Sequence, residues 1–207
     1  AAYLAGGIHA RATKKQWLLF VDQDTSFPSG AMDSYHQAVL LAKDHHPIFI
    51  PKLFSLGRMV SPFRYTTIRG HLTKNIDIKE LALDQYFAMN SGMLVNVVFY
   101  HAVGGHDRDI PLDFSDFAFL FRAKAQASVI IMVDLNAQHG SSFWSDEIQS
   151  VKLGRFQNYC QAALRMEKYI GQSFRIKAIL MARAFTLMFR FRSIRYLQIA
   201  WRAWVLG

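Results

Sequence analysis

Short apolar segments that alternate with amphipathic ones constrain the fold of this chain more than any other feature. Each apolar segment is bounded by polar residues, glycine or proline, which is typical of buried strands. Residues 31–40 and 113–125 instead carry apolar side chains at helical spacing. Because strands alternate with helices, the sequence predicts a layered α/β domain. The apolar segments are residues 16–21, 47–51, 92–103 and 128–133.

The remaining regions are expected to be loops or helices. Residues 52–80 are basic and are expected to form loops. Residues 150–206 are expected to be helical, and the segment 92–103 is expected to begin as a strand and end as a short helix.

The composition is compatible with one hydrophobic core. The chain has 207 residues, of which 52% are hydrophobic, and this is enough for one sizeable core. Its single cysteine, Cys160, excludes an intrachain disulfide. No apolar run reaches the ~18 residues that a membrane-spanning helix needs. The first residue is not Met and Gly207 follows an apolar segment, so we expect a fragment.

The net charge of +9 is unevenly distributed. Residues 143–207 contain 11 Lys and Arg and three acids, whereas residues 1–142 contain 13 basic and 12 acidic residues. The sequence therefore predicts a nearly neutral domain over residues 1–142 and a basic helical segment over residues 143–207. Such asymmetry suggests an anionic partner, either a membrane surface or a nucleic acid.

Two carboxylates follow the first apolar segment, in the stretch "WLLFVDQDTSFPSG". Ligands of open α/β sheets bind beyond the carboxyl ends of strands, and Asp22 and Asp24 lie at such an end. Paired carboxylates bind a hard divalent cation, and Mg²⁺ or Mn²⁺ would bring phosphate oxygens with it. The alternative is an acidic turn that caps the next helix, and the residues alone leave both interpretations open.

Three further residues are candidates for chemistry. Asp113 and Asp116 are three residues apart and can share one helical face, and a carboxylate near a metal-bound diphosphate can act as a general base. His139 follows the last apolar segment and can supply a third metal ligand. The alternative for Asp113 and Asp116 is that they only stabilise the N-terminus of a helix. The alternative for His139 is an ordinary loop histidine. A second Asp-x-Asp, at Asp107 and Asp109, follows a glycine turn and is expected to be solvated.

Taken in order, "WLLFVDQDTSFPSG" and "FAMNSGMLVNVVFYHAVGGHDRDIPLDFSDFAFLFRAKAQASVIIMVDLNAQHG" resemble the inverting family 2 glycosyltransferases of GT-A fold. The resemblance covers roughly residues 5 to 170, and the "DQD" form of the metal motif is similar to that of bacterial dTDP-rhamnosyltransferases. It implies a Rossmann-like mixed sheet flanked by helices. The implied activity is the metal-dependent transfer of L-rhamnose from dTDP-L-rhamnose to a glycan or lipid-linked glycan. This reaction would serve the synthesis of a surface polysaccharide such as O-antigen.

The resemblance also implies the residues that bind the donor. Asp22 and Asp24 would hold a divalent cation, Mn²⁺ or Mg²⁺, together with the nucleotide diphosphate, and His139 would complete the metal site. Ser91 and Gly92 would lie near the donor sugar.

The general base implied by the resemblance is Asp116, which precedes Arg122 by six residues. The chain departs from the family pattern nearby, because Ala118 stands where the family has Glu and His106 replaces an aromatic residue. The family's N-terminal strands, which carry much of the nucleotide-base pocket, have no counterpart before Ala1. We therefore expect the 207-residue chain alone to bind the donor poorly.

Residues 191–206 follow a helical pattern with two faces. Such a helix either lies in a membrane interface, where anionic lipid adds ~1 kcal/mol per basic residue, or packs its tryptophans on the domain. The lipid-linked acceptors of the family favour a peripheral protein on the cytoplasmic, inner face of the bacterial plasma membrane. A nucleic-acid partner is not expected, because the segment lacks a recognised binding motif. One face carries Ile194, Leu197, Trp201 and Trp204, and the other carries Arg192, Arg195 and Arg202.

The sequence therefore supports a leading hypothesis and two alternatives. The first is the glycosyltransferase. The second is a catalytically weakened relative that acts as a membrane-bound interaction module, which Ala118 favours. The third is a phosphate-binding α/β domain that does not act on sugars.

Overall fold

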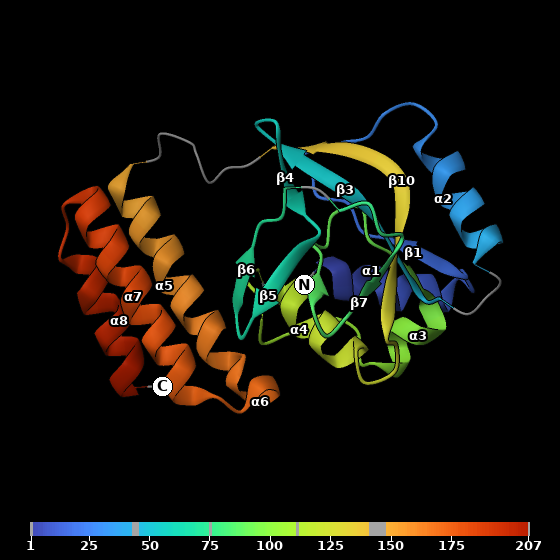
Figure 1. The fold of residues 1–207 in the computed structure, drawn as a ribbon. Coiled ribbons are helices and arrows are strands. Elements are labelled where there is room, and N and C mark those ends of the chain that lie inside the picture. Colours follow the sequence, from blue (N-terminus) through green and yellow to red (C-terminus); the bar gives the residue numbers. More distant parts are fainter. Residues whose placement is uncertain (1, 43–45, 75, 111, 141–147, 207) are drawn as a thin grey trace.

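Strands and helices alternate along much of the chain in the computed structural model, which describes residues 2–42, 46–74, 76–110, 112–140 and 148–206 (Figure 1). The strands are β1 (Trp17–Leu19), β2 (Thr25–Ser26), β3 (Ile48–Ser55), β4 (Arg58–Ser61), β5 (Phe63–Thr66), β6 (Arg69–His71), β7 (Glu80–Ala82), β8 (Tyr86–Phe87), β9 (Leu94–Asn96) and β10 (Val129–His139). The helices are α1 (Ala2–Ala12), α2 (Ala31–Leu41), α3 (Val97–Ala102), α4 (Ser115–Ala123), α5 (Gln149–Arg165), α6 (Glu167–Ile170), α7 (Ser173–Phe191) and α8 (Arg195–Leu206).

A mixed seven-stranded sheet forms the body of the protein. Its main path runs β1-β9-β3-β10-β2, with β4 paired to β3 and β7 paired to β10. The two central strands, β3 and β10, are parallel, and their other neighbours are antiparallel. A smaller sheet has the order β6-β5-β8. The predicted mixed α/β sheet with flanking helices is confirmed.

Both faces of the central sheet are covered. Ile48 and Ile50 of β3 belong to the larger hydrophobic cluster, which also includes Tyr100 of α3. Phe49, between them, belongs to a second cluster with Tyr35 of α2. This alternation follows from the pleat, which points successive side chains to opposite faces of a strand. Helices on both faces explain why β3 and the first half of β10, residues 129–133, have nearly continuous apolar sequences.

The prediction of loops over residues 52–80 is wrong, because β3 continues through Pro51 to Ser55 and the strands β4, β5 and β6 follow within this range. A proline lacks the N–H that a central strand donates to its ladder. The pairing of β3 with β10 shifts register at this point, between Ile50–Met132 and Lys52–Asn136. The irregularity accommodates the proline, and the strand then turns back as β4.

Helix α1 was not predicted, yet it brings an aromatic residue to the edge of the sheet where the candidate residues lie. It packs against α3, and Gly7 allows the close approach, since a Cβ there would lie 2.2 Å from the Tyr100 ring. Tyr3, one turn earlier, contacts the ring of Phe20, with ring centroids 5.0 Å apart.

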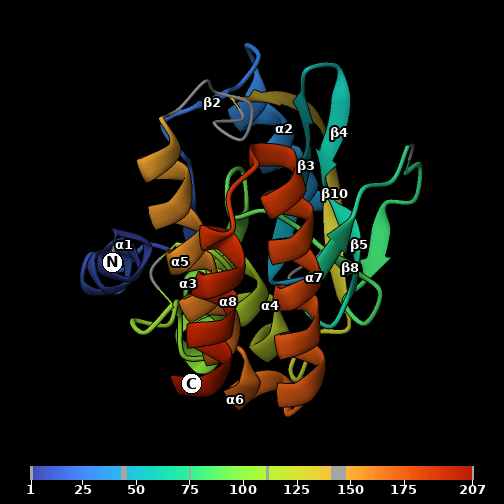
Figure 2. The same ribbon diagram turned by 90° about the vertical axis from the view of Figure 1, so that its left-hand side faces the viewer.

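The C-terminal helices form a layer of their own beside the sheet, as predicted for residues 150–206 (Figures 1 and 2). Helix α8 packs on α5 and α7 through Tyr196 and Ala200, which are buried. Trp201 remains 59% exposed, whereas Trp204 contacts the ring of Phe174. Within the described residues, no helix combines the length and apolarity needed to cross a membrane. The predicted domain boundary, between residues 142 and 143, lies outside the described residues.

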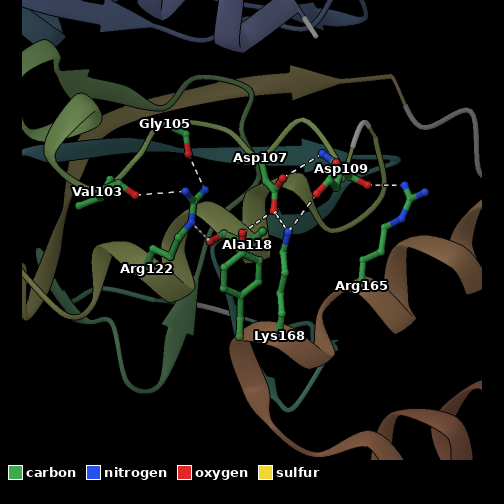
Figure 3. Close-up of polar contacts among 9 residues, drawn as sticks. Val103, Gly105, Asp107, Asp109, Ala118, Arg122, Arg165 and Lys168 are labelled. Carbon is green, nitrogen blue, oxygen red and sulfur yellow. Dashed lines mark hydrogen bonds and ion pairs between the residues drawn. The ribbon is translucent and has the colours of Figure 1, made fainter. Parts of the chain in front are cut away.

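The second Asp-x-Asp attaches this helical layer to the body (Figure 3). Asp107, which was expected to be solvated, accepts a hydrogen bond from Tyr169 and pairs with Lys168 at 2.5 Å. Burial alone would raise the pKa of Asp107, but the hydrogen bonds from Lys168 and Tyr169 outweigh it and lower the pKa to about 2. Asp109 has the expected exposure, with 72% of its side chain accessible, and its backbone carbonyl accepts a hydrogen bond from Arg165.

We expect Asp107→Asn to lower the free energy of unfolding by about 1–3 kcal/mol, because it removes the charge that Lys168 and Tyr169 recognise. The folded-state pKa lies below the unfolded value of about 3.9, so this stabilisation is present above pH ~4 and is lost as the pH falls towards 2. Urea unfolding at pH 7 and pH 3 measures both effects. The control, Asp109→Asn, should cost less than about 1 kcal/mol because that side chain is exposed, and equal losses in the two variants would contradict the assignment.

Candidate active site

Three of the predicted residues lie together at one end of the sheet. Asp22, Asp24 and His139 each offer a ligand atom, and these atoms lie within 4.8 Å of one another. Asp22 and Asp24 occupy the turn between β1 and β2. The register of β2 on β10 places His139 opposite Thr25, directly beside that turn. Because β10 is 11 residues long, its last residue, His139, lies beside the aspartates.

A short chain of hydrogen bonds fixes this turn. The backbone N–H of Asp22 donates to Ser91 Oγ at 3.1 Å, and Ser91 donates to Thr25 Oγ1 at 2.7 Å. Thr25 Oγ1 lies 2.8 Å from His139 Nδ1. Ser91 is buried, so it lies behind the aspartates as a residue that orients them.

The glycine after Ser91 is required by close packing. Gly92 lies in the left-handed region, with a φ of 76°, and a Cβ there would lie 2.4 Å from Pro51. Its carbonyl accepts a hydrogen bond from Tyr35 at 2.6 Å. Gly92 thus holds the loop before β9 against β3, beside the predicted donor site.

The donor set of the cluster fits a divalent cation. Two carboxylates and an imidazole suit Mn²⁺, and the carboxylates also suit Mg²⁺. The aspartates lack a Lys or Arg partner among the described ion pairs, and Asp24 keeps 41% of its side chain accessible. The Tyr3 hydroxyl donates a hydrogen bond to Asp22 Oδ1 and would thereby orient this carboxylate toward the cation.

Tyr3 is the site residue that sequence reasoning missed. It lies on α1, 19 residues before Asp22, and only the packing of α1 against the body brings it close. Burial, the hydrogen bond to Asp22 and nearby carboxylates all raise the pKa of Tyr3, so that it remains a hydrogen-bond donor. No local pattern around Tyr3 could have indicated this contact.

Asp116 lies in the first turn of α4 and faces the same cavity as the cluster. Burial is the main cause that raises the pKa of this carboxyl group to about 6, and the charges of Asp113 and Asp22 add to it. The backbone N–H of Phe117, which donates to Asp116 Oδ1 at 2.8 Å, acts in the opposite direction. A carboxylate whose pKa lies near the working pH is suited to accept a proton.

Two positions near Asp116 have structural tasks. Ala118 is fully buried, so this position lies in the core rather than on the cavity wall. Arg122 donates to the carbonyl groups of Ala118, Val103 and Gly105 (Figure 3) and thereby holds the glycine turn. Neither residue lines the cavity.

His106 is a neutral core side chain at the position where the resembled family has an aromatic residue. It is buried, stacks on Phe119 and pairs with Asn90 Oδ1 at 2.9 Å. Burial is the main cause that lowers the pKa of His106 to about 3, and the charge of Arg122 adds to it. The imidazole is therefore uncharged at neutral pH and fills an aromatic position.

A cavity of about 720 Å³ joins these residues to the C-terminal helices. Asp22, Asp24, His139 and Asp116 line the side that belongs to the body, and residues of α5 and α7 line the other side. The basic helical segment is therefore part of the wall of the candidate site.

Comparisons with known proteins give distant structural matches and no family assignment. No family model matches the chain, and no curated protein matches it. Residues 1–349 of S. aureus TarS in complex with UDP-GlcNAc match with a TM-score of 0.45 and 12% identity, over 95% of this chain and 70% of that one. A longer S. aureus TarS structure matches with a TM-score of 0.41 and 12% identity, over 95% of this chain and 42% of that one.

Proposed function

We propose that this chain belongs to an inverting glycosyltransferase that uses a divalent cation and a nucleotide sugar. The observation that carries the proposal is the cluster of Asp22, Asp24 and His139, whose ligand atoms lie within 4.8 Å on a cavity that Asp116 also lines. The ordered motifs that resemble family 2 enzymes support the same activity and favour dTDP-L-rhamnose as the donor. The proposed acceptor is a glycan or lipid-linked glycan.

Each residue has a defined task in this mechanism. Asp22, Asp24 and His139 would hold Mn²⁺ or Mg²⁺, and the bound cation would neutralise charge on the leaving diphosphate. The oxygen of the acceptor hydroxyl bonds to the anomeric carbon while the bond from that carbon to the diphosphate breaks. Asp116 accepts the proton that the hydroxyl loses. Displacement from the opposite side inverts the anomeric carbon. Tyr3 keeps Asp22 oriented.

Calorimetric titration tests the donor. dTDP-L-rhamnose is titrated into the complete protein with Mn²⁺ and with EDTA, and UDP-GlcNAc, the ligand named for the TarS structure, serves as the comparison. Metal-dependent binding of dTDP-L-rhamnose in preference to UDP-GlcNAc supports the proposal. Binding of plain nucleotides without any effect of metal or sugar would favour the phosphate-binding domain instead.

The pH dependence of turnover follows from Asp116. Because this carboxyl group must be ionised to accept a proton and its pKa is raised to about 6, we expect the rate to rise about tenfold per pH unit below pH 6. The rate should level off above pH 6 to 7. A pH–rate profile at saturating donor measures this, and a profile that stays flat down to pH 4.5 would exclude Asp116 as the base.

An interaction module remains the second candidate, because Ala118 stands where the resembled family has Glu. For such a module we expect no binding of the nucleotide sugar, with or without metal. Substitution of Asp116 separates the two functions, since a module would be unaffected.

We also propose that the outer surface of α8 binds an anionic membrane. Trp201 of α8 is exposed, and so are Arg195 and Arg202 of α8 and Arg192 at the end of α7. Anionic lipid favours each basic residue near its surface by about 1 kcal/mol, so neutralising all three arginines as Gln should weaken binding about 100-fold. Co-sedimentation with vesicles of about 30% phosphatidylglycerol in phosphatidylcholine, which have the negative surface potential of an anionic leaflet, measures this.

The control for the membrane experiment is a triple variant on the body. Arg11, Lys14 and Lys15 are exposed at the end of α1 and just beyond it. Their replacement by Gln removes the same charge and should leave vesicle binding unchanged. Equal losses in both triple variants would show that net charge alone, rather than α8, attracts the vesicles.

A further inference from the structure

Helices α5 and α7 each turn one basic face to the cavity. On α5 the lining residues are spaced i, i+3, i+4 and i+7, and on α7 they are spaced i, i+4, i+7 and i+8, so each set forms one helical stripe. Neither helix contains an acidic residue. The four basic residues of these stripes, called the basic wall, are Lys152, Arg155, Arg183 and Arg190. The aromatic and apolar residues between them are Phe156, Tyr159, Leu187 and Phe191.

The members of the basic wall are brought together by shared aromatic rings. Lys152 Nζ lies 4.8 Å from the centre of the Phe191 ring, and the guanidinium of Arg190 lies 5.3 Å from the same centre. The guanidinium of Arg183 lies 4.2 Å from the ring of Tyr159. The three arginines of the wall also interact within the protein, so a ligand would share them with existing partners.

The basic wall adjoins the acceptor side of the proposed reaction. Arg155 and Arg183 act electrostatically on Asp113, and Asp113 in turn acts on the proposed base, Asp116. The acceptor hydroxyl must lie against Asp116 to lose its proton. The donor diphosphate, by contrast, is assigned to the cluster of Asp22 and Asp24 on the body.

We infer that the basic wall binds a phosphate ester on the acceptor, and this inference rests on the proposed glycosyl transfer. Lys and Arg make their strongest hydrogen bonds to anionic oxygens, and Arg can contact two phosphate oxygens at once. The wall carries four cationic side chains, and Asp113 is a carboxylate that lines the same cavity and interacts electrostatically with two of them. A phosphate ester on the same acceptor as the reacting hydroxyl would balance this charge and direct the hydroxyl to Asp116.

The test uses two probes that differ in the phosphate. Ligand-observed NMR titrations compare α-D-glucose 1-phosphate with methyl α-D-glucoside, using protein whose donor site is first saturated with dTDP and Mn²⁺. We expect at least tenfold tighter binding of the phosphorylated probe. In the double variant Lys152→Gln/Arg190→Gln this preference should disappear, while dTDP affinity stays unchanged. The matched control, Lys15→Gln/Arg175→Gln, removes the same charge from exposed positions after α1 and on α7, away from the cavity, and should keep the preference.

Each other outcome counts against the inference. Equal binding of the two probes by the wild-type protein, or a preference that survives in the double variant, overturns it. Loss of dTDP affinity in the double variant assigns the wall to the donor diphosphate, which overturns the acceptor role and leaves the proposed transferase intact. If dTDP fails to bind the complete wild-type protein, the transferase proposal fails by itself. The same probes are then titrated in EDTA, where lack of a phosphate preference overturns phosphate binding by the wall.

Discussion

Replacing Asp116 with asparagine is expected to lower turnover by about 10²–10⁴-fold, the range that a general base contributes. Asn keeps the size of the side chain and a hydrogen-bonding oxygen for the Phe117 N–H, but it cannot accept a proton at neutral pH. The donor is held elsewhere, by Asp22 and Asp24, so its affinity should stay within about twofold of wild type.

The same substitution is expected to stabilise the fold. Since the folded-state pKa of Asp116 is raised to about 6, above the unfolded value of about 3.9, the carboxyl group favours the folded state only while protonated. That contribution is lost as the pH rises through 6, and a neutral Asn avoids the cost of a buried charge. Asp116→Asn should therefore raise the melting temperature at pH 8.

Steady-state kinetics with dTDP-L-rhamnose, calorimetry and thermal melting of the same preparations separate these effects. Asp134→Asn is the matched control, because Asp134 lies exposed on β10 and does not line the cavity. It should leave the rate unchanged. An Asp116→Asn protein that retains a tenth or more of the wild-type rate would show that another group takes the proton.

The second large effect is expected at the cluster. Asp24→Asn replaces an accessible carboxylate with a neutral amide, which is a much weaker ligand for Mn²⁺ or Mg²⁺. We expect metal-dependent donor affinity to fall at least about 100-fold, since even residues behind the ligands are commonly worth 10–100-fold in metal affinity. Turnover should fall with it.

Calorimetry of dTDP binding with Mn²⁺ and with EDTA measures this loss directly. The wild-type protein should show the difference between the two conditions, the Asp24→Asn protein should not, and Asp134→Asn should behave as wild type. Should the Asp24→Asn protein keep its metal-dependent affinity, the cluster would not be the metal site.

The sequence was most informative where apolar segments end in polar residues. The ends of the first and last segments supplied Asp22, Asp24 and His139, and β2 pairs with β10 so that these ends meet. Asp113 and Asp116 became candidates because their spacing puts them on one helical face, and the family resemblance singled out Asp116 as the base. The candidate positions are local in sequence, so periodicity and residue chemistry were enough to find them.

Other features depend on contacts between distant segments and left no local signal. Asp107 has the spacing of the metal motif, but its role as an attachment point is determined by Lys168 and Tyr169, which lie more than 60 residues later in the sequence. Pro51 suggested the end of a strand, whereas the shifted pairing with β10 lets the strand continue. Tyr3 reaches Asp22 only through the packing of α1.

The C-terminal helices show the same limit. The pattern of residues 191–206 predicted one apolar face with both tryptophans, but α8 buries Tyr196 and Ala200 and leaves Trp201 exposed. The pattern did not show that α5 and α7 bring basic side chains to the cavity. Which face of a helix is buried was decided by its neighbours in space, and these cannot be read from the helix alone.

Anomalous diffraction from crystals of this protein grown with Mn²⁺ and dTDP tests the central claim most directly. We predict an anomalous peak within coordination distance of Asp22, Asp24 and His139, with the diphosphate oxygens of dTDP on the same ion. A nucleotide bound in the cavity with no Mn²⁺ at these three residues, or with Mn²⁺ at another site, would contradict it.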